Sequence, residues 1–206
     1  MTKVFLSTPC YGGLCLEAYM SSIIKLQVLC LKEGIQLMID TTENESLVHR
    51  ARNVSVGRFM QKTDCDFLMF IDADIDFDPH AVLRLVKSGH DLSVACYPKK
   101  VVMWDQAANA IKAGDDRDMA MLSSSLVVNI GANKRSIVDG FVEVLDGPTG
   151  FMLIRRSVFK QLEEKFPELW CKNDHQNRDF DDYHDICRCE HHVGTRWKFT
   201  LQWLFG

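Results

Sequence analysis

The chain has 206 residues, 47% of them hydrophobic and 25% charged, a balance typical of one globular domain with a sizeable core. Its 24 Lys and Arg against 28 Asp and Glu give a formal net charge of -4, which excludes the broad positive surface of a general nucleic-acid-binding protein. Because the sequence has neither an apolar run of about 18 residues nor a charged and apolar leader, we expect a cytoplasmic protein without a membrane span.

Residues 3–7 form a short apolar run that breaks at Thr8 and Pro9, as a buried strand entering an irregular loop does. Apolar residues then recur at helical spacing over residues 16–31. Gly34 supplies a natural end for that helix. The chain therefore opens with a strand, a loop and a helix, in that order.

The alternation of strands and helices continues. Residues 35–39 predict a second strand, and a second helix is expected from about residue 46 to 60, after a polar loop at 40–45. Residues 66–71 form a continuous apolar run typical of a strand buried on both faces. Asp78 then has the position of an N-cap, before a helix that Gly89 ends.

The second half is less regular. A strand is expected at 92–97, and residues 101–140, with their acidic stretch, are interpreted as an insertion or lid. Strands at 141–145 and 151–154 and a helix from Ser157 to about Pro167 complete the pattern. Strands alternating with helices predict an α/β fold with a mostly parallel central sheet flanked by helices.

Eight cysteines are scattered along the chain, several of them in apolar stretches. We expect Cys30, Cys65 and Cys96 to be small buried hydrophobic side chains rather than members of a disulfide framework. The tail is a separate case, because it gathers nitrogen and sulfur ligands that could hold Zn²⁺: Cys171, His175, His184, Cys187, Cys189, His191 and His192. The Cys-x-Cys and His-His spacing matches no common structural zinc pattern, so zinc is the less favoured interpretation.

Ligands of open α/β sheets bind beyond the carboxyl ends of the strands. Asp72 and Asp74 follow the apolar run at 66–71 directly, and carboxylates at this spacing offer hard oxygen ligands to Mg²⁺ or Mn²⁺. The same edge is expected to include the segments 8–13, 97–100 and 147–150. An alternative is that the four Asp of residues 72–78 form only a solvated turn and a helix cap.

At this point the sequence resembles a known family. The segment FLMFIDADIDFDP is similar to the strand and Asp-x-Asp motif of glycosyltransferase-A fold enzymes. Together with FLSTPCYGG, NESLVHRARN, ACYPKK and GPTGFMLIRRSVF, in this order, it resembles small bacterial, phage and viral glycosyltransferases, those of chlorella viruses in particular. The resemblance covers residues 3–160, with 101–140 poorly matched.

The resemblance implies a single glycosyltransferase-A-like domain over residues 1–206, with a nucleotide-binding part at 1–100 and an acceptor-side part and tail at 101–206. It implies a metal-dependent enzyme, using Mn²⁺ or Mg²⁺, that moves a hexosyl or deoxyhexosyl group from a nucleotide-sugar to a glycan or other hydroxyl acceptor. A UDP-sugar is the expected donor. A viral chain of this kind would act in the host cytoplasm.

The donor contacts that the resemblance implies are Thr8, Pro9, Tyr11, Arg52, Asp72, Ala73, Lys99 and Gly150. Tyr11 could stack on the base or be an ordinary loop tyrosine. Arg50 and Arg52 lie two apart on a helix and cannot both face one ligand, so Arg52 is chosen for the donor, and an ion pair with Glu45 is the alternative for Arg50.

The expected metal ligands are Asp72, Asp74 and His192, and the candidates for the catalytic base or nucleophile are Asp146, Asp181 and Asp182. The tail departs from the family at this point, because the acidic segment expected before the terminal histidine is absent or replaced by Asp181 and Asp182. Two other hypotheses stay open: a nucleotidyltransferase, and a non-catalytic module that binds a nucleotide-sugar. The loop at 8–13 contains no Lys or Arg, which disfavours the nucleotidyltransferase.

Overall fold

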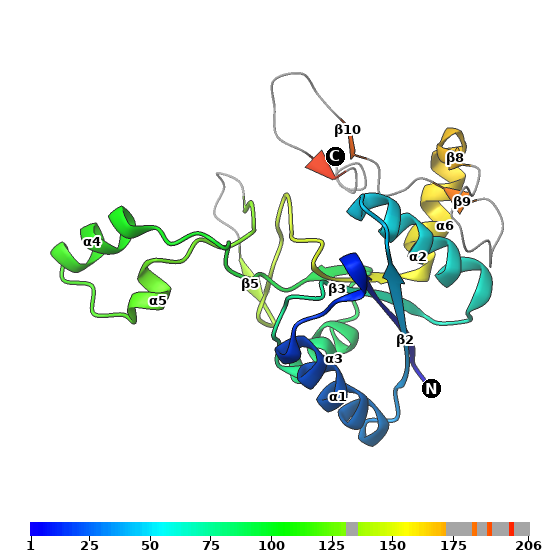
Figure 1. Ribbon diagram of the computed structural model, residues 1–206, viewed down its shortest axis with the longest axis horizontal. Helices are drawn as coiled ribbons and strands as arrows, with labels where there is room; N and C mark the ends of the chain where they lie inside the picture. Colours follow the sequence, from blue (N-terminus) through cyan, green and yellow to red (C-terminus); the bar gives the residue numbers. More distant parts are fainter. Residues whose placement is uncertain (131–135, 172–182, 185–188, 191–197, 200–206) are drawn as a thin grey trace. The chain divides into compact units, whose positions relative to one another are not determined.

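The structure is a computed structural model that describes residues 1–130, 136–171, 183–184, 189–190 and 198–199 (Figure 1). It divides into two compact units, one made of residues 1–94 with 149–206 and the other of residues 95–148. No helix in the described ranges has both the length and the apolar composition needed to cross a bilayer.

A five-stranded sheet forms the centre of the first unit. Its strands, in the order β2-β1-β3-β7-β4, are β1 (Lys3–Cys10), β2 (Gln36–Glu43), β3 (Phe67–Ile71), β4 (Leu92–Val94) and β7 (Phe151–Arg155). β1 is parallel to β2 and β3, whereas β7 is antiparallel to both of its neighbours, β3 and β4. Four of the five strands therefore share one direction, which confirms the expected mostly parallel sheet.

Helices cover both faces of this sheet. The four are α1 (Glu17–Lys32), α2 (Val48–Lys62), α3 (Pro79–Lys87) and α6 (Arg156–Lys165). Figure 1 shows α1 and α3 on one face and α2 and α6 on the other. On the second face the Phe59 ring packs against Phe5 and Phe159, with ring centres 6.0 and 5.6 Å apart. Burial of these apolar side chains supplies the main driving force for folding.

The helix ends follow the signals in the sequence. α1 and α3 are followed by Gly34 and Gly89, whose φ angles of 68° and 79° suit a residue without a side chain. Asp78 accepts a hydrogen bond from the backbone N–H of His80, so it caps α3 as predicted.

Three strand predictions were wrong in extent. β2 continues to Glu43, through residues expected to form a loop, because it pairs with β1 over its whole length. β4 ends at Val94 rather than at residue 97, so Cys96 is exposed and not buried as expected. Of residues 141–145, only Phe141–Val142 (β6) form a strand, which pairs with β5 (Ile137–Val138) and not with the central sheet.

The second unit contains two short helices besides the β5–β6 hairpin, α4 (Trp104–Lys112) and α5 (Met119–Leu122). Residues 101–140, interpreted from sequence as an insertion, therefore include regular structure. In the last part of the chain, β8 (Trp170–Cys171) pairs with β9 (Tyr183–His184), and β10 (Cys189–Glu190) pairs with β11 (Lys198–Phe199).

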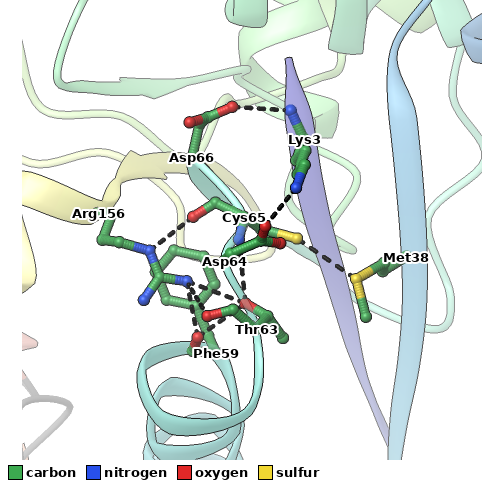
Figure 2. A network of polar contacts seen from close by, with 8 residues as sticks. All are labelled: Lys3, Met38, Phe59, Thr63, Asp64, Cys65, Asp66 and Arg156. Carbon is green, nitrogen blue, oxygen red and sulfur yellow. Dashed lines mark hydrogen bonds and ion pairs between the residues drawn. The ribbon is translucent and has the colours of Figure 1, made fainter. Parts of the chain in front are cut away.

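Arg156, the first residue of α6, binds the carboxyl end of α2 (Figure 2). Its guanidinium lies over the Phe59 ring, 4.1 Å from the ring centre, and donates to the carbonyls of Phe59 (2.8 Å), Met60 (3.2 Å) and Thr63 (3.1 Å). It also donates to the carbonyl of Cys65, just before β3. The last carbonyls of a helix lack partners within that helix, and one side chain supplies them here.

We predict that Arg156→Ala lowers the free energy of unfolding by about 2–4 kcal/mol, because several partly buried carbonyls lose a charged donor at once. Urea denaturation followed by circular dichroism measures this change. Lys160→Ala, an exposed position on the same helix, should stay within about 0.5 kcal/mol of wild type. Equal stability of the two variants would show that the Arg156 network is not needed for the fold.

Candidate functional site

The carboxyl end of β1 leads into an exposed turn. Thr8 is fully buried and its hydroxyl is hydrogen-bonded to that of Tyr19 on α1. The next residues, Tyr11–Gly13, form one turn of 3-10 helix, and the Tyr11 side chain is 77% exposed. Pro9, which lies between Thr8 and this turn in the sequence, is half-buried. Thr8, Pro9 and Tyr11 are the donor contacts expected in this loop, and of these only Tyr11 has a largely exposed side chain.

An ion pair joins α2 to the end of β3. Arg52 is only 3% exposed, and its Nη2 donates to Oδ1 of Asp72 over 2.7 Å. The guanidinium carbon also lies 5.7 Å from the centre of the Phe70 ring. Asp72 is partly exposed, so the pair extends from the interior to the surface. Buried arginine is rarely found without such a partner.

Arg50 takes the alternative role weighed from the sequence. Its Nε lies 3.0 Å from a carboxylate oxygen of Glu45, in an ion pair at the start of α2. Residues two apart on a helix point in different directions, which is why Arg50 and Arg52 meet different acids.

The backbone after β3 is held at several points. The Asp72 N–H donates to the carbonyl of Gly150 over 2.9 Å. The carbonyl of Ala73 accepts the N–H of Leu16, also at 2.9 Å. Gly150 reaches this edge because β7 runs antiparallel to β3, so that the start of one strand meets the end of the other. Asp72 and Ala73 therefore have defined backbone positions.

The acidic side chains of this loop have different surroundings. Asp76 accepts a hydrogen bond from the Ser22 hydroxyl (2.9 Å), and Asp78 caps α3. Asp72 binds Arg52, whereas Asp74 is exposed. The alternative of a plain solvated turn accounts for Asp76 and Asp78, but it does not explain why a buried arginine is directed at Asp72.

Two of the expected site residues, Lys99 and Asp146, belong to the second unit. Lys99 has an exposed side chain, and its N–H donates to the carbonyl of Ser125 over 2.7 Å. A carboxylate oxygen of Asp146 accepts a hydrogen bond from Nδ2 of Asn129 at 2.8 Å. The expected metal ligand His192 and the candidate acids Asp181 and Asp182 lie outside the described residues.

Mg²⁺ is often held by one or two carboxylates together with substrate phosphates. The carboxylates of Asp72 and Asp74 are ligands of this type. No group of three or more His, Cys, Asp or Glu side chains that could hold a metal occurs within the part of the chain that the structure describes. Of the tail residues weighed for zinc, Cys171, His184 and Cys189 belong to β8, β9 and β10, whereas His175, Cys187, His191 and His192 lie outside the described residues.

Sequence reasoning did not identify several hydroxyl groups that support the site. The Ser55 hydroxyl on α2 lies 2.6 Å from that of Ser7 on β1 and 3.3 Å from that of Thr42 on β2. All three residues are buried. Their signal in the sequence is weak, because serine and threonine are equally common on exposed surfaces.

The fold and the site define an α/β protein with a five-stranded, mostly parallel sheet and a pair of acidic residues beyond the carboxyl end of a central strand. No protein-family model matches the chain, and no curated protein matches it. Among solved structures, the crystal structure of A197 from STIV is similar, with 22% sequence identity and a TM-score of 0.43. The match covers 76% of this chain and 66% of that one, less than two thirds of its length. A likeness this distant assigns neither a family nor an activity.

Burial raises the pKa of the Tyr19 phenol to about 12, from its ordinary value of about 10. The unfolded phenol ionises first as pH rises, so the stability from the neutral buried phenol is complete below about pH 10 and is lost as pH approaches 12. We predict that by pH 11 wild type loses about 1.4 kcal/mol of unfolding free energy from this group. Urea denaturation at pH 8 and pH 11 measures the loss, and Tyr19→Phe should abolish this contribution. An unchanged pH dependence in Tyr19→Phe would contradict the assignment.

Proposed function

We propose that the chain is a metal-dependent glycosyltransferase that moves a sugar from a nucleotide-sugar, a UDP-sugar in the first instance, to a hydroxyl group of a glycan. The observation that carries the proposal is the acidic pair at the end of β3, in which Asp72 is bound by the buried Arg52 and Asp74 is exposed. The ordered motifs that resemble glycosyltransferases support the same assignment.

In this proposal the two acids have different tasks. Asp74 binds the divalent ion directly, because its carboxylate is exposed on the loop. Asp72 has one oxygen engaged by Arg52. Its carboxylate would help to hold the ion or would bind a ribose hydroxyl. A divalent ion held there, Mn²⁺ or Mg²⁺, would supply positive charge to balance the charge that develops on a nucleoside diphosphate leaving group.

Arg52 then acts through Asp72. The family resemblance implies a direct contact between this arginine and the donor. Its side chain is only 3% exposed, however, and its guanidinium donates to Asp72 within the protein. We therefore assign Arg52 as a positioning residue that fixes the orientation of the Asp72 carboxylate. Tyr11, with its exposed ring, is the proposed stacking partner of the base.

The proposal is tested by thermal unfolding of the chain with UDP, GDP, CDP and UDP-sugars, each with Mn²⁺, Mg²⁺ or EDTA. A ligand at about 100 times its dissociation constant adds about 2.7 kcal/mol, which raises the unfolding midpoint by several degrees in a chain of this size. We expect a shift for a uridine nucleotide only when metal is present.

Two variants make this test specific. Asp74→Asn should abolish the metal-dependent shift and change the unliganded free energy of unfolding by no more than about 0.5 kcal/mol, since the residue is exposed. Asp78→Asn is the matched control, because it removes a charge from the same loop while asparagine caps a helix as well as aspartate does. No metal-dependent shift with any nucleotide, or an undiminished shift in Asp74→Asn, would contradict the assigned site. A shift without release of UDP from a UDP-sugar and acceptor would favour the non-catalytic module.

A further inference from the structure

Helix α1 is apolar on two faces. Its inner face is buried in the first unit and includes Tyr19, Ile23, Leu26 and Cys30. A helix that covers a sheet normally has a polar outer face. On the outer side, however, Leu16, the residue directly before α1, and four residues of the helix are large, apolar and 48% to 69% exposed; the four are Met20, Ile24, Val28 and Leu31.

These five residues, called here the outer seam, form one continuous line. Met20, Ile24 and Val28 are spaced four residues apart and Leu31 follows three residues later, so these four lie along one side of the helix, and Leu16 directly precedes it. From Met20 to Leu31 the line is about 16 Å long at 1.5 Å per residue. A continuous apolar surface of this kind on a folded protein marks an interaction site, whereas isolated exposed apolar residues do not.

We propose that the outer seam packs against the outer seam of a second copy of this chain, with the two α1 helices antiparallel about a twofold axis at Ile24. This register places Ile24 against its own counterpart and Met20 against the partner's Val28. Leu16 then lies near the partner's Leu31. The seam is nearly symmetric about Ile24, as suits an interface between identical surfaces.

Charges at the two ends of the seam favour the same occupant. Glu17 lies in the first turn of α1 and Lys32 in the last, and both are exposed. The antiparallel register brings Glu17 beside the partner's Lys32, and this pairing occurs twice. Parallel helices would instead bring like charges together and align the helix dipoles. The pattern therefore fits a second, antiparallel copy of the same helix.

The dimer is expected to be weak. Specific interfaces bury about 800 Å² per partner, more than five half-exposed side chains supply, so flanking residues must contribute. A dissociation constant on the order of micromolar is consistent with an interface at the small end of the range.

Sedimentation velocity of the full chain, from about 1 to 200 µM, tests the proposal. Wild type should convert from monomer to dimer over this range. Ile24→Lys places two ammonium groups at the twofold axis and should raise the dissociation constant at least about tenfold. Ile111→Lys, at a position of similar exposure (49% against 59%) on the second unit, should dimerise as wild type does.

Charge reversal tests the register. Glu17→Lys and Lys32→Glu should each weaken the dimer by bringing like charges together, and the double reversal should restore it. Recovery in the double variant requires the two residues to be neighbours across the interface. Additive weakening in the double variant would overturn the antiparallel register.

Three other results would overturn the dimer itself. The first is a wild type that stays monomeric at every concentration. The second is that wild type is monomeric and that Ile24→Lys lowers the unfolding midpoint while Ile111→Lys does not, because the seam would then be covered by another part of the same chain. The third is that the monomer binds phosphatidylcholine vesicles and that Ile24→Lys abolishes this binding, which would identify a lipid surface as the partner.

Discussion

Helix α2 is fixed to strand β3 at both of its ends, and the candidate site depends on that arrangement. At the carboxyl end of the helix, the Arg156 guanidinium donates to the last carbonyls of the helix and to the carbonyl of Cys65, two residues before β3. Near the other end, Arg52 binds Asp72, where β3 terminates. Between them the Phe59 ring packs in the core. A helix held in this way keeps Arg52 and the carboxylate in a fixed relation, as a binding site requires.

The direction of β7 decides which segments meet at the edge of the sheet. Because β7 is antiparallel and lies between β3 and β4, its first residues lie beside the end of β3, and Gly150 binds the backbone of Asp72. On the other side, the N–H of Leu16, just before α1, donates to the carbonyl of Ala73, and the hydroxyl of Ser22 on α1 donates to Asp76. The acidic loop is therefore positioned by backbone and side-chain hydrogen bonds from segments that are distant in the sequence.

Local signals in the sequence predicted much of this fold, because apolar runs, helix caps and glycine ends act over a few residues. Examples are the apolar run that forms β3, the helix cap at Asp78 and the glycine at position 34 that follows α1. Features that depend on pairing between distant segments were missed. The extension of β2 to Glu43 comes from its register with β1, and Cys96 is exposed because β4 stops at Val94. The pairing of Arg52 with Asp72 is a long-range contact of the same kind, and periodicity does not reveal it.

The measurement that tests the central claim most directly is the electron paramagnetic resonance signal of free Mn²⁺ in the presence of protein and UDP. The account predicts that protein and UDP together remove more of this signal than the sum of their separate effects. It also predicts that Arg52→Met weakens this binding no more than Asp72→Asn does, and that the double variant matches Asp72→Asn, because Arg52 acts through Asp72. A free Mn²⁺ signal that protein leaves unchanged in the presence of UDP would contradict the account.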